Sequence, residues 1–335
     1  MRIIFLAKKT DSASYIFYKS CISELKEFDP SVKITFKKLS DQYEYKYFDI
    51  AIFMGGAIDS FKAKKNNPNI KCVVIDSRSG HYDRIDFTDL LISNGIENYL
   101  FNLNNKYKNF IYPTYPKIEY KNKLSKNNKN LIIGYHGNKI HLEAMYPRIT
   151  DALKNINKSN KIELFAMYNI KGLGESKIVN SNKLGFTVKH IQYSNENYTK
   201  YLSKADIGIV PQLIPTKDNF FIRYLETSNF NKYNQSYNDY KLRFKDTTNL
   251  GRHFIFCQLG IPFISDITPS SCIFVKNEIN GFLSHSTSNW EYYINMLISD
   301  EELRKKIAQK AYDDWKESYS HDKLNAKLLD VLKKL

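Results

Sequence analysis

The sequence has no run of 18 apolar residues, the length that a helix needs to cross a bilayer. Its first residues, MRIIFLAKK, lack the apolar length of a signal peptide and are typical of a first strand. The sequence therefore predicts a cytoplasmic protein without a membrane-spanning segment.

Cysteine is scarce, with four residues, and no two of them form a C-x-x-C pair. Cys21, Cys72, Cys257 and Cys272 all lie in apolar stretches. This pattern predicts reduced cysteines in the core rather than disulfides or a metal site.

The charges show an excess of one sign but no cluster. There are 50 Lys and Arg against 35 Asp and Glu, a net charge of +15, without a block of five or six like charges. Zinc-ligand spacing, RNP-type aromatic strands and repeats are also missing, so nothing specific supports binding to nucleic acid. A solvated lysine-rich surface, an anionic membrane surface and small phosphorylated ligands remain as explanations.

The length of 335 residues suits two domains, and the 42% of hydrophobic residues is typical of a globular protein. In the first 115 residues short, continuously apolar runs alternate with helical or loop segments, as expected for a parallel sheet covered on both faces. The predicted strands of this half cover 2–7, 32–39, 49–56, 71–78, 89–95 and 109–116.

A polar, lysine-rich linker at 117–130 separates a second series of the same kind. Its predicted strands cover 131–138, 161–168, 188–193, 206–212, 261–266, 272–275 and 281–284. Helices are predicted over 140–156, near 195–204, over 288–298 and over 300–335, the last broken near Tyr319. The expected division is an N-terminal domain over 1–120, a C-terminal domain over 121–320, and a final helix over 321–335 that packs back on the first domain.

Residues 213–244 interrupt the second series with an aromatic and basic segment that is too long for an ordinary connection. Two interpretations stay open: a surface insertion, or a lid that stacks aromatic rings on an acceptor.

The stretch 245–266, KDTTNLGRHFIFCQLGIPFISD, has the features of an anion site. Thr247, Thr248 and Asn249 are natural N-cap residues, and a helix of apolar periodicity runs from about Leu250 to Leu259. Lys245 and Arg252 add cations where a helix already carries partial positive charge, so an external anion would explain them. An ordinary capped helix with incidental cations is the alternative.

The order of segments from about 130 to 320 resembles the C-terminal half of GT-B-fold glycosyltransferases, especially family 4. The residues that carry the resemblance are DIGIVPQ (206–212), the helix that ends in GIPFISD (260–266), NGFL (280–283) and the helix with SDEELR (299–304), with IGYHGN (133–138) as a first strand and loop. The resemblance implies two Rossmann-like domains that face each other across a cleft, and a nucleoside diphosphate sugar as donor.

One departure concerns the paired glutamates of many family members, whose positions hold Thr247 and Ile255 here. Lys245 and Asn249 fit a polar segment that some divergent relatives use instead.

The sequence also has no D-x-D triplet, which commonly holds a metal ion in sugar transfer. The helix start with Lys245 and Arg252 is the metal-free alternative for the charge on the leaving diphosphate, so no cofactor or metal is expected. Gly137 and Asn138 are expected to approach the phosphates, and His136 to contact the donor or to serve structure. By resemblance, Gln192 and Tyr193 hold the base.

A catalytic base is expected from the first half. His81 follows a predicted strand and is the candidate, oriented by Asp76 or Asp83; a surface histidine is the alternative. Gly55 and Gly56 form a second loop that would allow close approach of the acceptor.

The sequence thus predicts a cytoplasmic, metal-independent glycosyltransferase of bacterial surface polysaccharide synthesis, with a glycan or lipid-linked acceptor and its basic surface on the inner face of the membrane. A silent GT-B-like scaffold that binds sugar nucleotides or glycans is the alternative; nucleic acid is not an expected partner.

Overall fold

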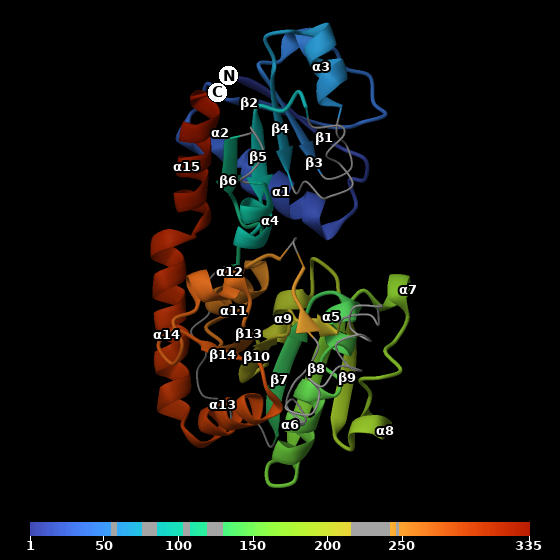
Figure 1. The fold of residues 1–335 in the computed structure, drawn as a ribbon, viewed down its shortest axis with the longest axis vertical. Helices are drawn as coiled ribbons and strands as arrows, with labels where there is room; N and C mark the ends of the chain where they lie inside the picture. Colours follow the sequence, from blue (N-terminus) through green and yellow to red (C-terminus); the bar gives the residue numbers. More distant parts are fainter. Residues whose placement is uncertain (55–58, 76–85, 103–107, 119–129, 216–241, 246–247) are drawn as a thin grey trace, which may run out of the picture. The chain divides into compact units, whose positions relative to one another are not determined.

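The structure is a computed structural model that describes residues 1–54, 59–75, 86–102, 108–118, 130–215, 242–245 and 248–335 (Figure 1). The chain divides into two compact units. Unit 1 contains 1–117, 246–255 and 313–335, and unit 2 contains 118–245 and 256–312.

Unit 1 is built on a six-stranded parallel sheet of order β2-β1-β3-β4-β5-β6. Its strands are β1 Arg2–Ala7, β2 Lys33–Lys38, β3 Ile50–Met54, β4 Lys71–Ile75, β5 Leu90–Ser93 and β6 Lys108–Ile111. Its helices are α1 Ala13–Ser23, α2 Leu25–Phe28, the 3-10 turn η1 Tyr45–Tyr47, α3 Ser60–Asn66, α4 Ile96–Asn102 and α15 His321–Lys333. The inner strands β1 and β3 to β5 are almost entirely buried, as their continuous apolar runs predict.

Helix α15 closes unit 1 although it comes from the end of the chain, and it packs on α1 and α2. Asn325 donates to the carbonyl of Cys21 at 3.0 Å, and Tyr112 donates to the side chain of Asn325. His321 lies beside them with its Nε2 3.1 Å from the carbonyl of Tyr115. A buried polar cluster therefore fixes this helix on the unit.

Unit 2 repeats the architecture with a parallel sheet of order β14-β13-β10-β7-β8-β9. Its strands are β7 Leu131–His136, β8 Ile162–Tyr168, β9 Thr187–Gln192, β10 Ile207–Val210, β13 Phe263–Asp266 and β14 Phe282–Ser284. Its helices are α5 Lys139–Glu143, α6 Arg148–Asn157, α7 Ile170–Leu173, α8 Ser181–Leu184, α9 Tyr198–Leu202, α12 Pro269–Phe274 and α13 Thr287–Ser299. Two more helices, α11 Gly251–Leu259 and α14 Glu301–Ser318, cross the boundary between the units.

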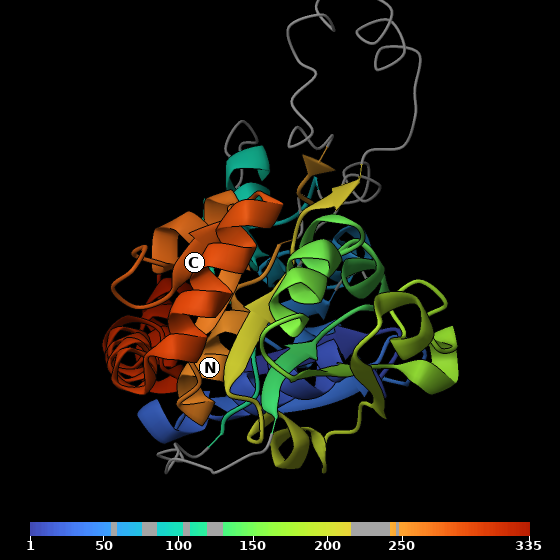
Figure 2. The ribbon, with the colours of Figure 1, turned by 90° about the horizontal axis from the view of Figure 1, so that it is seen from below.

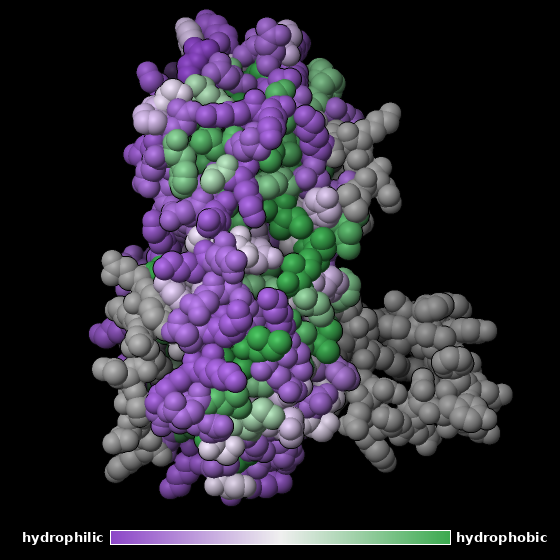
Figure 3. Space-filling model, turned by 90° about the vertical axis from the view of Figure 1, so that its left-hand side faces the viewer, coloured by the Kyte–Doolittle hydropathy of each residue, from purple (hydrophilic) through white to green (hydrophobic). Residues whose placement is uncertain are grey.

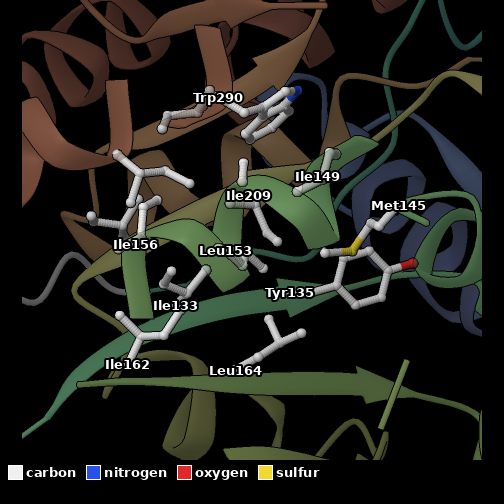
Figure 4. Close-up of a cluster of buried hydrophobic side chains, with 14 of the residues drawn as sticks. Ile133, Tyr135, Met145, Ile149, Leu153, Ile156, Ile162, Leu164, Ile209 and Trp290 are labelled. Atoms are coloured by element: carbon white, nitrogen blue, oxygen red, sulfur yellow. The ribbon is translucent and has the colours of Figure 1, made fainter. Parts of the chain in front are cut away.

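One face of the unit 2 sheet carries a large hydrophobic cluster (Figure 4). Alternate residues of β7, such as Ile133 and Tyr135, point into it, because side chains alternate between the faces of a strand. Helices α6 and α13 cover this face, and Trp290 of α13 is fully buried there. Seen from below, helices lie on both sides of the sheet (Figure 2).

The opposite face of this sheet receives α11 through a hollow made by two glycines. Gly134 of β7 and Gly208 of β10 are direct partners in the sheet. A Cβ atom built on Gly208 would lie 2.7 Å from atoms of the Phe256 ring. The ring therefore fits only because β10 leaves out a side chain at Gly208, whereas a Cβ atom on Gly134 would lie 2.6 Å from the Cβ atom of Ala205.

The fold-class prediction is confirmed: both halves are α/β units on parallel sheets. The predicted break near Tyr319 in the helix over 300–335 is confirmed as well, since α14 ends at Ser318 and α15 begins at His321.

Two expected elements are wrong. The helix predicted over 140–156 is two helices, α5 and α6, with Pro147 between them, because proline has no N–H to continue a helix. The strand predicted over 272–275 is helical, since Thr268 caps α12 through the amide of Ser271 and Pro269 starts it. As a result Cys272 is exposed, whereas the other three cysteines are buried as predicted, and none of the four forms a disulfide.

Only the base of the insertion at 213–244 lies within the described residues. There β11 Ile214–Pro215 pairs antiparallel with β12 Leu242–Arg243, while 216–241 lie outside the described residues.

None of the helices in the described part of the chain is long and apolar enough to span a membrane. The face in Figure 3 is mainly hydrophilic, with smaller hydrophobic patches between.

Candidate functional site

The carboxyl ends of all six parallel strands of unit 2 lie at one edge of the sheet, where ligands of such sheets bind. Five of the predicted site residues lie at this edge. His136 ends β7 and is followed by Gly137 and Asn138, and Gln192 ends β9 and is followed by Tyr193. Strand β8 lies between β7 and β9.

The loop after β7 is held rigidly. Gly137 has a φ of 146°, a conformation that side chains rarely adopt, and its N–H donates to the carbonyl of Met167 at 3.1 Å. Asn138 caps α5 by accepting from the N–H of Ile140 at 3.1 Å, and the Tyr135 hydroxyl donates to the Asn138 carbonyl at 2.6 Å. A loop fixed in this way presents its backbone to a ligand without further ordering.

His136 belongs to the packing of the sheet. Its side chain is 6% exposed, and its ring lies edge to face with Phe256 of α11 at 5.2 Å. It follows Tyr135 on β7 and so points to the α11 face, where the glycine hollow lies. The geometry favours the structural alternative for this histidine, although contact with a donor stays a prediction.

The side chains after β9 are engaged with their own unit. Gln192 accepts from the N–H of Lys171 at 2.7 Å and donates to the carbonyl of Tyr193 at 2.8 Å. The Tyr193 hydroxyl donates to Asn195 at 2.7 Å, and burial together with the Glu196 carboxylate raises the pKa of Tyr193 to about 12. Tyr193 is therefore a neutral ring near pH 7, and base binding by this pair stays a prediction.

The start of α11 is organised by Asn249, which lies two residues before the first helical residue, Gly251. Its Oδ1 accepts from the N–H of Gly251 at 2.9 Å, and its Nδ2 donates to the carbonyl of Thr114 at 3.0 Å. A Cβ atom at Gly251 would lie 2.5 Å from this carbonyl oxygen, so glycine is required there. The side-chain amide of Asn249 is thus occupied within unit 1.

The other residues of the predicted anion site are spread over both units. Thr248 is buried and Arg252 is half-buried in unit 1, while Lys245 is half-buried in unit 2. Their common contact with one anion stays a prediction. Ile255 is 5% exposed, so an apolar core side chain occupies the position of one family glutamate.

Several predicted residues lie outside the described residues: His81 with Asp76 and Asp83, Gly55 and Gly56, and Thr247. Within the described part of the chain no three His, Cys, Asp or Glu side chains are grouped so that they could hold a metal ion. Metal independence stays a prediction.

Sequence reasoning missed a buried ion pair at the same edge of the unit 2 sheet. Arg148 of α6 donates to both carboxylate oxygens of Asp266 at 2.6 and 2.9 Å, and the two side chains are 1% and 0% exposed. Asp266 also accepts from the N–H groups of Gln212 and Leu213 at 2.8 and 2.9 Å. The pair therefore fastens the segment after β10 to the end of β13. The only signal in the sequence was an aspartate at the end of a buried strand.

Comparison with known proteins supports the fold. No family model matches the chain, and the curated proteins give no match. Among solved structures, HepE of Anabaena in complex with UDP is 13% identical with a TM-score of 0.64, and the match covers 100% of both chains. Sucrose-phosphate synthase of Thermosynechococcus elongatus is 10% identical with a TM-score of 0.65, over 99% of this chain and 98% of the other. The lipopolysaccharide outer core galactosyltransferase WaaB is 13% identical with a TM-score of 0.59, over 100% of both chains. The chain thus has the fold of the GT-B glycosyltransferases along its whole length.

Proposed function

We propose that the protein is a glycosyltransferase that moves a sugar from a nucleoside diphosphate sugar to a glycan or lipid-linked glycan of a bacterial surface polysaccharide. The observation that carries this proposal is the match over the full length of HepE, which is solved with UDP. The similarity to WaaB, a lipopolysaccharide galactosyltransferase, supports the class of acceptor.

The donor would lie at the carboxyl edge of the unit 2 sheet. The Gly137–Asn138 loop offers rigid backbone there, because Gly137 adopts a φ that other residues avoid and Asn138 caps α5. Tyr193 offers a neutral ring and the backbone that follows β9 to the nucleoside base.

Charge on the leaving diphosphate needs stabilisation as the glycosidic bond breaks. The first turn of α11, GRHF, holds no acidic side chain, so the partial positive charge of the helix start and the Arg252 guanidinium have the same sign. With Lys245 they would supply this stabilisation without a metal. In the same proposal His81 acts as the base that activates the acceptor. Gly55 and Gly56 contact the acceptor.

Titration calorimetry with UDP and UDP-glucose, with and without EDTA, tests the donor site. We expect Lys245→Ala and Arg252→Ala each to weaken binding roughly 10- to 100-fold, the loss of one charged hydrogen bond. Lys334→Ala, an exposed lysine at the far end of α15, serves as the control. Unchanged affinity in both site variants would exclude the anion site, and loss of binding in EDTA would exclude the metal-free mechanism.

The second candidate function is a silent scaffold that binds a sugar nucleotide or glycan. The residues at the positions of the paired glutamates favour the scaffold, because neither Thr247 nor the apolar Ile255 carries a carboxylate. Release of UDP from UDP-glucose in the presence of a panel of glycan acceptors distinguishes the two. Turnover selects the enzyme, and tight UDP binding without turnover on any acceptor selects the scaffold.

A further inference from the structure

Unit 1 has an open groove of about 880 Å³ along its edge strand β2. The groove lies between β2, the connection from β2 to β3, and α3. None of the residues predicted for the donor or acceptor lines it. Its lining includes Thr35, Lys37, Gln42, Tyr43, Tyr47 and Asn66.

Four aromatic residues line the groove: Tyr43, Tyr45, Tyr47 and Phe48. Tyr45 is 4% exposed and belongs to a hydrophobic cluster of unit 1, on which Tyr43 and Phe48 also pack. The rings of Tyr43 and Tyr45 meet edge to face at 5.3 Å. Tyr47, in contrast, is 55% exposed, a large exposure for an aromatic side chain in a short turn. The groove thus combines fixed rings with the exposed ring of Tyr47. The Lys46 ammonium lies over this ring, 5.0 Å from its centroid, so a ligand would stack on the opposite face.

Hydrogen-bonding groups fill the rest of the lining. Lys37 makes no ion pair with any residue in the described ranges, and it is half-buried beside the groove. Gln42 is exposed, and Asn66 donates to the carbonyl of Lys62 at 2.8 Å, which leaves its amide oxygen for an incoming donor.

The two carboxylates of the lining are already engaged. Glu44 pairs with Lys46, and Asp41 accepts from the N–H of Lys38 at 2.8 Å. Three lysines of the lining, Lys37, Lys46 and Lys62, therefore stand against these two carboxylates, and the Lys37 ammonium forms no ion pair with the described residues. This balance suits a ligand that is rich in hydroxyl groups and is either neutral or negatively charged.

The groove is also long enough for an extended ligand. It runs from Leu39, just beyond the carboxyl end of β2, to Phe48, two residues before the start of β3. Strands β2 and β3 both pair with β1 in parallel, so these two points lie about one strand length apart, roughly 20 Å for six residues.

We propose that this groove is a glycan-binding site, in which a chain of several sugar units stacks its ring faces on Tyr47 and Tyr43 and bonds its hydroxyl groups to Lys37, Gln42 and Asn66. A lipid chain would need a continuous apolar lining, which these polar side chains interrupt. The site needs no sugar transfer, and it would keep a long glycan on the protein independently of the donor site.

A glycan array with neutral and acidic oligosaccharides, probed with the full chain, tests the proposal. Tyr47→Ala and Lys37→Ala are the test variants, since both side chains line the groove and Tyr47 is exposed. Tyr292→Ala, an equally exposed tyrosine at 59% in unit 2, and Lys33→Ala, an exposed lysine on the same strand β2, are matched controls.

We expect the native chain to bind at least one class of oligosaccharide, and each test variant to weaken that binding roughly tenfold, the upper end for one ring contact. Both controls should bind as the native chain does. The proposal would be overturned if the native chain bound no glycan on the array, or if Tyr47→Ala and Lys37→Ala both bound as tightly as the native chain. UDP affinity, measured in parallel, reports on the donor site alone. The glycan-binding proposal can therefore fail while the proposed donor site stands, and the reverse.

Discussion

Single residues at the end of the chain control the stability of unit 1. His321 of α15 is 4% exposed, with Nε2 3.5 Å from the Cys21 sulfur and Nδ1 3.6 Å from the Glu24 carboxylate. Lys117 also approaches Glu24, at 3.5 Å. Burial by itself would lower the pKa of His321, but Cys21 and Glu24 raise it to about 9.

This raised pKa makes stability depend on pH. The protonated histidine stabilises the folded state fully below its unfolded pKa of about 6.5, and the contribution disappears as the pH rises through about 9. We expect the free energy of unfolding in urea to fall by on the order of 3 kcal/mol over this window. His321→Gln should remove most of the slope, whereas His285→Gln, an exposed histidine, should keep it. Equal slopes in both variants would contradict the role of His321.

The buried ion pair in unit 2 is a second single-residue determinant. Asp266→Asn leaves the Arg148 guanidinium buried without its carboxylate, so unfolding in urea should become easier by about 3–5 kcal/mol. The exposed pair of Asp330 and Lys334 offers the control, because Asp330→Asn should cost less than about 1 kcal/mol. Losses of similar size would mean that burial of the Asp266 pair does not govern its contribution.

At the scale of elements, the position of α11 depends on the glycine hollow in the unit 2 sheet. Phe256 fills the space above Gly208 and contacts His136, so the hollow links the helix to the loop after β7. The same face of β7 therefore sets both the packing of α11 and the orientation of a candidate site residue.

Gly208→Ala tests this packing, since its new Cβ atom would lie 2.7 Å from the Phe256 ring. We expect a loss of about 1–3 kcal/mol in the free energy of unfolding. Combining it with Phe256→Leu should cost less than the sum of the two single changes, because the smaller side chain makes room. Strict additivity in this double-mutant cycle would show that the helix does not rest on the hollow.

At the scale of the whole molecule, the net charge of +15 governs encounters with anionic surfaces. If the protein works on a lipid-linked acceptor, we expect it to sediment with vesicles that contain phosphatidylglycerol and not with vesicles of phosphatidylcholine alone. Binding should vanish near 1 M salt, where the Debye length falls to about 3 Å. Equal sedimentation with both kinds of vesicle, or none at low salt, would exclude this electrostatic attachment.

The sequence by itself determined the two series of strands. Inner strands such as β1 and β3 are continuous apolar runs that only a sheet covered on both faces can bury, while edge strands such as β2 carry polar residues as well. The sequence also determined the break between α14 and α15 and the presence of a polar side chain at the start of α11, since caps and breaks depend on neighbouring residues. The same local logic failed at 272–275, where an apolar run looked like a strand but Thr268 and Pro269 start a helix.

Tertiary structure alone decided the contacts between distant residues. Arg148 and Asp266 are 118 positions apart, and no local pattern indicates that a helix end and a strand end will meet. The Gly134–Gly208 pair and the Phe256 ring above it likewise depend on strand register, and the groove beside β2 exists because the sheet places this strand at its edge. Local sequence sets secondary structure through short-range sterics and hydrogen bonds, whereas burial and binding surfaces arise only when separate elements pack.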